Sequence, residues 1–336
     1  MGAHLFFICN IQTVMMNKLL VSIICLQLFC GCLREEQPLP PHISGDINTV
    51  SITIGYPYRY QVYYDCTTNT ILQSNSKYDW DIALECSPTG YHVLLNNALG
   101  MLAANLGDMP IQSIPDLSGL SWGWDNPDGN LDSTALGDWR IDHPTYLINR
   151  QYNDEGDFLG YEKLQIVELD SEHYTIKYCP KDSTRAITKT IAKNYNRNFI
   201  YFNFDNGNIQ DLEPAKDKWD LLFTNHHHKF DNLTYPFVLT QVLTNKHNGI
   251  TVAEDNQNRF NTISLKDTAS YTFTNLWDEI GYDWKIRNSA DNSFTIDPLK
   301  SYIIKANDKK FYKIRFIDFY NAVGEKGYPK FEIQSL

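Results

Sequence analysis

Cysteine and methionine are scarce in this chain of 336 residues, which has seven Cys and five Met against 21 Tyr and 17 Phe. Four of the seven cysteines lie within the first 32 residues, so only Cys66, Cys86 and Cys179 remain for the rest of the chain. Three cysteines do not predict a framework of disulfides. A bridge between Cys66 and Cys86 is not favoured, because the two do not lie opposite each other in the hairpin expected there.

Positive charge and long apolar stretches are also lacking. The 29 Lys and Arg residues are outnumbered by 40 Asp and Glu residues, for a formal net charge of −11, and no basic run stands out. This balance argues against nucleic acid or an anionic membrane surface as a partner. The apolar stretch at residues 19–29 is shorter than the roughly 18 residues that a membrane-spanning helix needs.

Signatures of catalysis are missing as well. We identify no nucleophile elbow, no His-Glu-x-x-His zinc motif and no phosphate-binding loop. We therefore predict a protein that is not an enzyme. A secreted hydrolase is a distant alternative, because catalytic triads and carboxylate pairs need no local signature.

The amino-terminal segment indicates export. Lys18 precedes the apolar stretch 19–29, a pattern typical of a signal peptide, with Met15 and Met16 as alternative starts to Met1. The following Cys30-Gly31-Cys32 resembles a bacterial lipoprotein signal that would be lipidated at Cys32, with Cys30 as the alternative. An uncleaved anchor is the other interpretation.

We divide the chain accordingly. Residues 1–31 are a predicted lipoprotein signal peptide, 32–47 a lipidated cysteine and flexible, proline-containing tether, and 48–336 one β-rich domain. The acidic segment 33–36 resembles the export signal of surface lipoproteins in Bacteroidota. These features predict an outer-membrane lipoprotein at the cell surface, held to the membrane by its lipid anchor alone.

The domain is expected to be mostly β with few short helices. Tyr, Phe, Thr and Ile are abundant, and Asn, Asp and Gly punctuate the alternating segments. A helix is expected at 97–106, a helical turn near 263–268 and a long loop at 108–142. Strands are expected at 50–54, 59–65, 78–85, 164–168, 174–178, 186–192, 236–243, 249–253, 282–286, 301–305, 311–318 and 330–334.

One segment occurs twice. An aromatic strand, a polar turn and a Trp-Asp strand occupy residues 62–84, and the same series occupies 201–223, aligned without a gap when Trp80 is placed on Trp219. We predict two similar hairpin units rather than a solenoid, because two copies cannot form a repeat stack. Only the second copy continues into His226-His227-His228, so these histidines are an addition to the shared scaffold.

The histidine run ends an alternating strand. Trp219, Leu221 and Phe223 are expected on its buried face. On an extended backbone, His226 and His228 then share a face while the histidine between them points the other way. The alternative is a polar strand end exposed to water.

The carboxy-terminal part of the chain contains an ordered series of motifs. They are Ile280-Gly281-Tyr282-Asp283-Trp284-Lys285, Tyr302-Ile303-Ile304-Lys305, Tyr312-Lys313-Ile314-Arg315-Phe316-Ile317-Asp318-Phe319-Tyr320 and Gly324-Glu325-Lys326-Gly327-Tyr328-Pro329-Lys330-Phe331-Glu332. This series, together with the Trp-Asp strands at Trp80 and Trp219, resembles the HmuY family, the haem-binding lipoproteins of Bacteroidota. The resemblance is dense over 195–336.

This resemblance implies an antiparallel β protein that binds haem outside the membrane for iron acquisition and passes it to a TonB-dependent receptor. It implies a binding function without catalysis, with the iron held between two axial side chains, His or Met. The alternative function is a glycan- or protein-binding surface lipoprotein on the same scaffold.

Haem iron needs a neutral imidazole or a thioether beside an apolar wall. His228 and His226 are the first candidates, because neighbouring histidines suppress one another's protonation. His247 is the candidate for the second ligand, with Met101 and Met109 as alternatives that are more typical of core packing. Candidates for binding the haem propionates are Lys246 and Arg259, although solvated charges are the simpler interpretation.

Two further features have simpler explanations. Residues 125–132 space oxygen ligands as a calcium loop does, but they lack the terminal Glu of an EF-hand, so an Asx-rich turn is favoured over calcium. Trp122 and Trp124 precede this segment and form either a platform for a sugar or other ring, or buried anchors for the loop.

Overall fold

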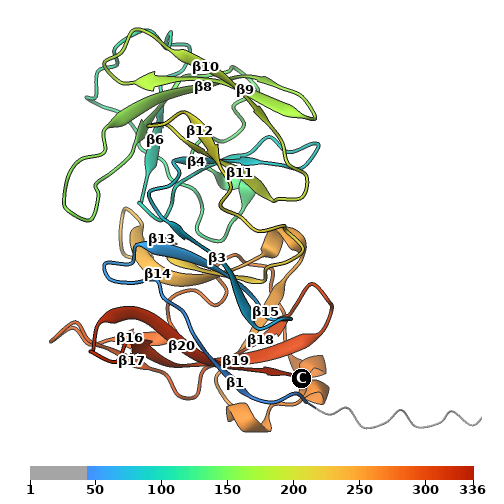
Figure 1. The fold of residues 1–336 in the computed structure, drawn as a ribbon. Coiled ribbons are helices and arrows are strands. Elements are labelled where there is room, and N and C mark those ends of the chain that lie inside the picture. Colours follow the sequence, from blue (N-terminus) through green and yellow to red (C-terminus); the bar gives the residue numbers. More distant parts are fainter. Residues whose placement is uncertain (1–43) are drawn as a thin grey trace, which may run out of the picture. The chain divides into compact units, whose positions relative to one another are not determined.

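Antiparallel sheets account for nearly all regular structure in residues 44–336, the part of the chain that the computed structural model describes (Figure 1). There are two five-stranded sheets, two four-stranded sheets and one two-stranded sheet, and the helices among the described residues are short 3-10 turns. The predicted mostly β, antiparallel fold is therefore confirmed. No helix within 44–336 is both long and apolar enough to cross a membrane. The predicted signal peptide, Cys32 and most of the tether lie outside the described residues.

The chain forms two halves with similar strand orders, preceded by β1 (Asn48–Ser51). The strands of the first half are β2 (Tyr60–Asp65), β3 (Thr70–Ser76), β4 (Ile82–Glu85), β5 (Val93–Leu95), β6 (Leu102–Asn105), β7 (Tyr146–Asn149), β8 (Tyr161–Leu169), β9 (His173–Pro180) and β10 (Ile187–Ala192), with the 3-10 helix η1 (Leu131–Ser133) between β6 and β7.

The second half repeats the hairpin and the strand that follows it. Its strands are β11 (Phe199–Asn203), β12 (Asn208–Gln210), β13 (Leu221–His228), β14 (Phe237–Thr244), β15 (Thr251–Asp255), β16 (Lys285–Arg287), β17 (Phe294–Ile296), β18 (Ser301–Lys305), β19 (Phe311–Tyr320) and β20 (Lys326–Ser335). Its 3-10 helices are η2 (Lys246–Asn248), η3 (Phe260–Thr262) and η4 (Leu265–Ser270).

The two four-stranded sheets are built by exchange between the halves. Hairpin β2–β3 of the first half joins β13 and β14 of the second in the order β14-β13-β2-β3. Reciprocally, hairpin β11–β12 of the second half joins β4 and β5 of the first in the order β12-β11-β4-β5. Both predicted hairpin units are present. Each Trp-Asp segment, however, leads into a strand of the other sheet instead of pairing with its own hairpin.

The registers show how the halves correspond. Leu222 pairs with Tyr63, and Ala83 pairs with Tyr201, so the two tyrosines are equivalent. The gapless sequence alignment places Val62 on Tyr201 and is therefore one residue out in this strand. The hydroxyl oxygens of the two tyrosines lie 3.3 Å apart. Because equivalent residues contact each other, the halves are related by a local pseudo-twofold axis at this point.

The repeated tryptophans make reciprocal contacts across the same interface. The ring of Trp80 packs edge-on against Tyr201, with centroids 5.0 Å apart, and the ring of Trp219 packs edge-on against Tyr63 at the same 5.0 Å. Trp219 thus lies on the face that meets the other four-stranded sheet, whereas Leu221 packs in a different cluster. The prediction that Trp219 shares a face with Leu221 is wrong, because β13 begins only at Leu221 and the two preceding residues do not continue its alternation.

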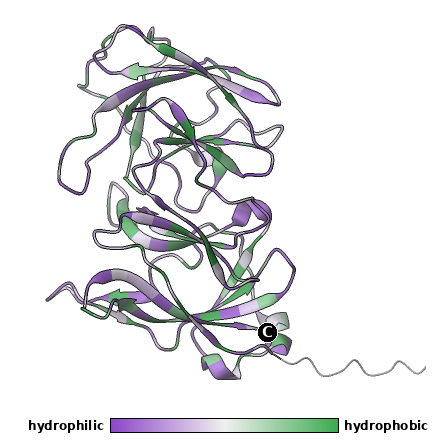
Figure 2. Cartoon of the chain, viewed as in Figure 1, coloured by the Kyte–Doolittle hydropathy of each residue, from purple (hydrophilic) through white to green (hydrophobic). Residues whose placement is uncertain are grey.

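Each four-stranded sheet packs its other face on a five-stranded sheet. One core joins Val62 and Leu221 to residues of the sheet β1-β20-β19-β18-β15, such as Tyr302. The second core joins the sheet β12-β11-β4-β5 to the sheet β10-β9-β8-β7-β6 in the same way. Hydrophobic and hydrophilic residues both occur along the strands, because successive side chains point to opposite faces of a sheet (Figure 2). Two cores of this size are consistent with a chain rich in Tyr, Phe and Ile.

The helix predicted at 97–106 is wrong. Residues 97–100 form turns, and β6 follows, where Ala103 pairs with both Ile148 and Gly123. Gly100 has a φ of +74°, which no α-helix contains, and the side chain of Asn96 accepts a hydrogen bond from the Ala98 N–H in place of a helical partner. The helical turn expected near 263–268 is present as η4, and 108–142 is largely loop as predicted.

Candidate functional site

The histidine run belongs to a long hairpin rather than to a free strand end. β13 and β14 pair over eight residues, and the pairs His226–Leu239, His227–Val238 and His228–Phe237 are all in register. The equivalent strands of the first half, β4 and β5, pair over only three residues. The histidines therefore occupy an extension specific to the second half, as the sequence comparison predicts. His226 and His227 are buried and His228 is half-buried, so exposure to water is the wrong interpretation for the first two.

His226 is held in the neutral state. Its Nε2 lies 3.1 Å from the carbonyl oxygen of Pro127, and because a carbonyl can only accept, Nε2 carries the proton and donates. Its ring packs against Trp277 with centroids 5.2 Å apart. Burial, assisted by the charge of neighbouring His227, lowers the pKa of His226 to about 3. A metal at Nε2 would have to displace the bond to Pro127.

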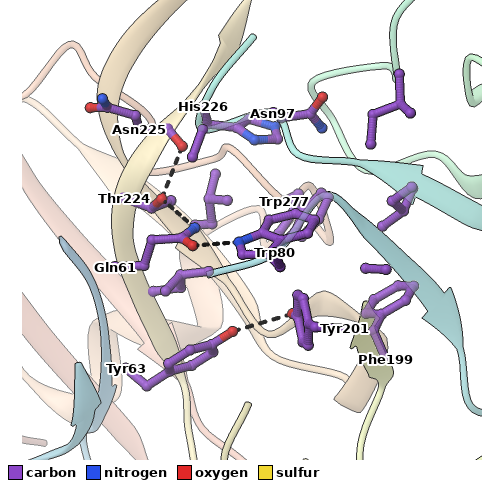
Figure 3. A pocket seen from close by; sticks show the side chains of 16 residues that line it. Gln61, Tyr63, Trp80, Asn97, Phe199, Tyr201, Thr224, Asn225, His226 and Trp277 are labelled. Atoms are coloured by element: carbon purple, nitrogen blue, oxygen red, sulfur yellow. Dashed lines mark hydrogen bonds between the residues drawn. The ribbon is translucent and has the colours of Figure 1, made fainter. Parts of the chain in front are cut away.

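The space beside His226 is small. Side chains of the two four-stranded sheets face each other there, and hydrogen bonds join Gln61 to Thr224 and to Trp80 (Figure 3). The cavity between them, which His226 lines, measures about 30 Å³. That volume suits a water molecule and not a porphyrin.

His247 reaches the same tryptophan from η2. Its ring lies 5.7 Å from Trp277 and 5.1 Å from Phe199, centroid to centroid, and its buried Nε2 has no hydrogen-bond partner among the described residues. Burial and then the charge of Lys246 lower its pKa to about 4. The structure therefore brings the predicted ligands His226 and His247 to one tryptophan, but without a space between them for a large ligand.

The predicted cationic partners of a propionate have different surroundings. Lys246 donates from Nζ to the carbonyl oxygen of Asp128 at 2.9 Å, and Arg259 is exposed just before η3. Of the methionine alternatives, Met101 is fully buried in the core of the first half, whereas Met109 is partly buried in the following loop. None of these four residues lines the larger cavity described below.

His228 has different surroundings. Its ring lies 4.5 Å from Tyr282 and 4.6 Å from Phe230, centroid to centroid. Burial lowers its pKa, although the charges of Asp278 and Asp283 oppose the shift. Both aromatic neighbours line a larger cavity, so His228 contacts its wall without being one of its lining residues.

This larger cavity has the dimensions of a ligand site. Its volume is about 370 Å³, within the range of about 300–1,000 Å³ that is usual for small-molecule pockets. It is formed mainly by apolar and aromatic side chains of the histidine hairpin, its loop and the segment around β16. The lining residues are Tyr58, Asn225, Phe230, Leu233, Phe237, Val238, Leu239, Thr240, Tyr282, Lys285, Arg287 and Phe294.

The segment 125–132 is a series of Asx turns, as favoured from the sequence. Asn126, Asp128 and Asn130 each accept a hydrogen bond from the backbone N–H two residues later. Asp125 is buried and accepts from the backbone N–H groups of Leu95 and Ala135, while burial raises its pKa to about 6. Within 44–336, no cluster of three or more His, Cys, Asp or Glu side chains has the geometry to hold a metal ion.

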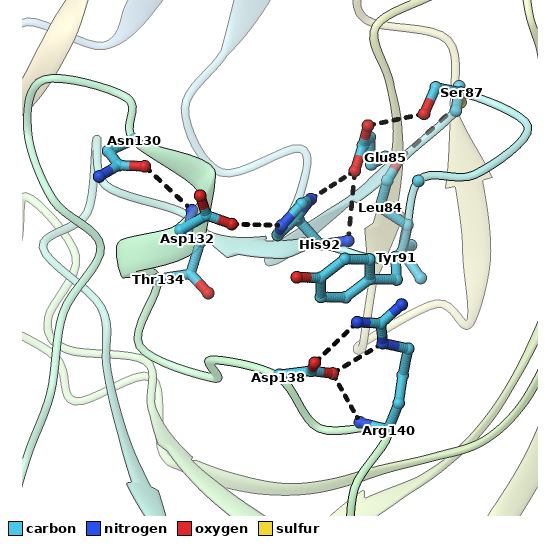
Figure 4. A network of polar contacts seen from close by, with 12 residues as sticks. Leu84, Glu85, Ser87, Tyr91, His92, Asn130, Asp132, Thr134, Asp138 and Arg140 are labelled. Carbon is cyan, nitrogen blue, oxygen red and sulfur yellow. Dashed lines mark hydrogen bonds and ion pairs between the residues drawn. The ribbon is translucent and has the colours of Figure 1, made fainter.

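One polar network has the residue types of a catalytic triad. His92 Nδ1 lies 2.6 Å from Glu85 Oε2, and the Ser87 hydroxyl donates to the other oxygen of Glu85 at 2.7 Å (Figure 4). The carboxylate separates the serine from the imidazole, so His92 cannot take a proton from Ser87 as a general base must. The far nitrogen of His92 faces Asp132 instead, at 3.7 Å. This network connects the β4–β5 hairpin to η1.

A second serine has the spacing of a nucleophile elbow that the sequence analysis did not identify. Ser121 is the centre of Gly119-Leu120-Ser121-Trp122-Gly123. The motif requires a strand before the serine and a helix after it, and this segment lies in an irregular loop with an exposed serine. It therefore is not an elbow.

Comparison with known proteins gives the family. The sequence model of the family described as HmuY protein matches residues 57–333, which include both Trp-Asp segments, the histidine hairpin and the larger cavity. The chain belongs to the HmuY family. No curated protein matches the sequence.

Two solved structures resemble this HmuY-family chain only distantly. The apo HmuY analogue TFO of Tannerella forsythia is 10% identical, and the alignment covers 88% of this chain and 98% of that one, with a TM-score of 0.33. Apo PinO from Porphyromonas gingivitis is also 10% identical, covering 87% and 97%, with a TM-score of 0.30. Family membership therefore rests on the sequence match over 57–333.

Proposed function

We propose that this HmuY-family protein binds haem or a related tetrapyrrole in the cavity beside the histidine hairpin. The observation that carries the proposal is the contact of His228, a half-buried imidazole, with Phe230 and Tyr282, two aromatic residues that line an apolar space of about 370 Å³. An aromatic wall and a neutral imidazole are what a haem site requires. Burial keeps His228 in the neutral form at neutral pH.

His228 is the first candidate for the axial ligand. His226 and His247 are the second choice of axial ligands. Both rings pack on Trp277, so a ligand that contacts both histidines would have to displace that tryptophan from between the four-stranded sheets. Haem bound by this protein would be cargo rather than a catalytic cofactor. We propose that it is held for iron acquisition and handed to a TonB-dependent receptor, by a protein that is lipidated at Cys32 and located on the outer membrane. The mass of the mature protein would reveal the lipid.

Titration with haemin tests the proposal. Protein lacking residues 1–33 is expected to give a sharpened Soret band that saturates at one equivalent. In the His228→Ala variant the band should shift, and the affinity should fall by about tenfold or more, because an axial bond is lost. His173→Ala, which removes a histidine whose side chain is 42% exposed on β9, is the matched control and should behave like the wild type. A featureless difference spectrum at every ratio would exclude haem. A shift in His226→Ala alone would move the ligand to the smaller cavity.

Exposed aromatic residues favour a second candidate function, the binding of a glycan. Trp122 stacks on Tyr161 with centroids 5.9 Å apart and an interplanar angle of 24°, and Phe158 packs on the same tyrosine. Phe158 and Tyr152 are 42% and 58% exposed, which makes this a surface platform rather than a buried anchor. A glycan array run beside the haemin titration distinguishes the two functions.

A further inference from the structure

Lys285, the first residue of β16, is a buried lysine whose bonding capacity is not filled. Its exposed fraction is 7%. Nζ donates to the carbonyl oxygens of Thr240 at 2.7 Å and Tyr282 at 3.2 Å. A lysine ammonium has three N–H donors, so one remains. The ammonium also lies 4.5 Å from the ring centre of Trp284 and 5.3 Å from that of Phe319.

No carboxylate in the part of the chain that the structure describes neutralises this ammonium. Among residues 44–336, Lys285 forms no ion pair within 4 Å, and the nearby Asp283 is engaged by Lys300 at 2.7 Å. Burial lowers the pKa of Lys285 to about 7, and Asp283 opposes the shift only through its charge. A buried charge without a counter-ion is costly, so an anion brought to Lys285 would be bound strongly.

The cavity beside the histidine hairpin is open to this cation. Lys285 and Arg287 both line it, no Asp or Glu of the described residues does, and apolar and aromatic side chains form most of the remaining wall. Arg287 is exposed and hydrogen-bonds only to the side chain of Asn292 among the described residues. In a chain with a net charge of −11, a cavity whose charged groups are all positive calls for an anionic ligand.

We propose that this cavity binds apolar molecules that carry a carboxylate, and that the Lys285 ammonium holds the carboxylate inside it with Arg287 nearby. The chemistry fits a tetrapyrrole propionate and a fatty acid equally well. The inference deepens the proposed haem function, which supplies one such ligand, but it depends neither on iron nor on His228.

A buried lysine can donate hydrogen bonds to two backbone carbonyls without lining a cavity, as Lys313 shows. Lys313 donates to the carbonyls of Phe260 and Ile263 at 2.6 and 2.7 Å, and it lies 4.7 Å from the ring centre of Phe260. It is 2% exposed and does not line the cavity. Lys313→Met therefore removes the same kind of paired hydrogen bonds as Lys285→Met and serves as its matched control.

The test compares acids with their neutral analogues. Fluorescence titration of protein lacking residues 1–33 would use iron-free protoporphyrin IX against its dimethyl ester, and competition would use oleate against oleyl alcohol. The wild type should bind each acid about tenfold or more tightly than its neutral analogue, since a hydrogen bond to a charged group contributes that much. Lys285→Met should lose this preference, and Lys313→Met should keep it while melting at a lower temperature. Arg287→Gln, an exposed change, should weaken the preference even if Lys285→Met does not fold.

Equal binding of acid and neutral analogue by the wild type, or an unchanged preference in folded Lys285→Met, would overturn the inference. The two proposals fail separately. A flat haemin spectrum together with Lys285-dependent oleate binding removes the tetrapyrrole but keeps the carboxylate site. Haemin binding that depends on His228 and is unaffected by esterification keeps the haem site but removes the carboxylate site. Binding of oleate but not of protoporphyrin IX would assign the site to lipid carboxylates.

Discussion

Replacing Arg150 by methionine is expected to lower the free energy of unfolding by about 3–5 kcal/mol, the usual cost of leaving one partner of a buried ion pair uncompensated. Nε of Arg150 donates to Asp81 at 2.9 Å, and its two terminal nitrogens donate to Asp205 at 2.7 and 2.8 Å. The Asp81 contact should dominate, because that carboxylate is 1% exposed whereas the side chain of Asp205 is 69% exposed.

The loss in Arg150→Met should grow with pH. Burial raises the pKa of Asp81, and it raises the pKa of nearby Glu162 to about 8, with Arg150 opposing both shifts. Groups whose folded pKa exceeds the unfolded value favour the folded state at low pH and lose this contribution as pH rises through the folded pKa. Without the guanidinium both carboxyls should titrate still higher. The variant should therefore lose more stability than the wild type between pH 5 and pH 8.

Urea unfolding, followed by tryptophan fluorescence at pH 5 and pH 8, measures the free energy of unfolding of both proteins. Arg197→Met is the control, because Arg197 pairs with Asp211, whose side chain is 81% exposed. This substitution should change the free energy of unfolding by less than about 1 kcal/mol. The double variant with Asp81→Asn should recover part of the stability, because it removes the unpaired charge. A loss that is the same at pH 5 and pH 8 would contradict the assignment of the buried carboxylates.

The second large effect concerns two asparagines in equivalent places. Asn96 donates from its side chain to the carbonyls of Lys77 and Trp80 at 2.7 and 2.8 Å. Asn245 does the same in the second half, donating to the carbonyls that precede β13 at 2.8 and 2.9 Å. Both asparagines are fully buried. Asn96 directly follows β5, and Asn245 directly follows β14. Each one therefore joins the end of that strand to the start of a Trp-Asp segment.

Changing either asparagine to alanine should cost about 3 kcal/mol or more, because at least two buried carbonyls are left unsatisfied at about 1–3 kcal/mol each. The two losses should be similar in size if the halves are equivalent. Asn232→Ala, in the exposed loop between β13 and β14, should leave the midpoint of urea unfolding within experimental error. A large loss in only one of the two buried variants would show that the halves are not energetically equivalent.

Several site features were predictable because they are local. The extension of the histidine strand is visible as the difference between His226 and its counterpart after Trp80. The Asx turns at 125–132 follow from the spacing of short polar side chains. The helix at 97–106 was mispredicted because an Asn-initiated turn and a left-handed Gly100 outweigh the apolar residues nearby.

Lys285 had no comparable signal. It stands in the tail motif Tyr282-Asp283-Trp284-Lys285, where the sequence suggests an ordinary strand lysine, and its role depends on Thr240 and on a loop more than forty residues earlier. Likewise, the burial of His226 comes from Pro127 and Trp277, which are remote in the chain. Periodicity describes the two faces of a strand, not what covers them.

Residue order alone was enough for the β class, the family, the duplicated Trp-Asp segments and the strand that carries the histidines, since alternation and motif spacing are properties of neighbouring residues. The exchange of hairpins between the halves, the water-sized space at His226 and the cationic apolar cavity at Lys285 emerged only in three dimensions. Each of these is created by segments that are far apart in the chain and meet only when the sheets pack, and no short-range pattern encodes such a meeting.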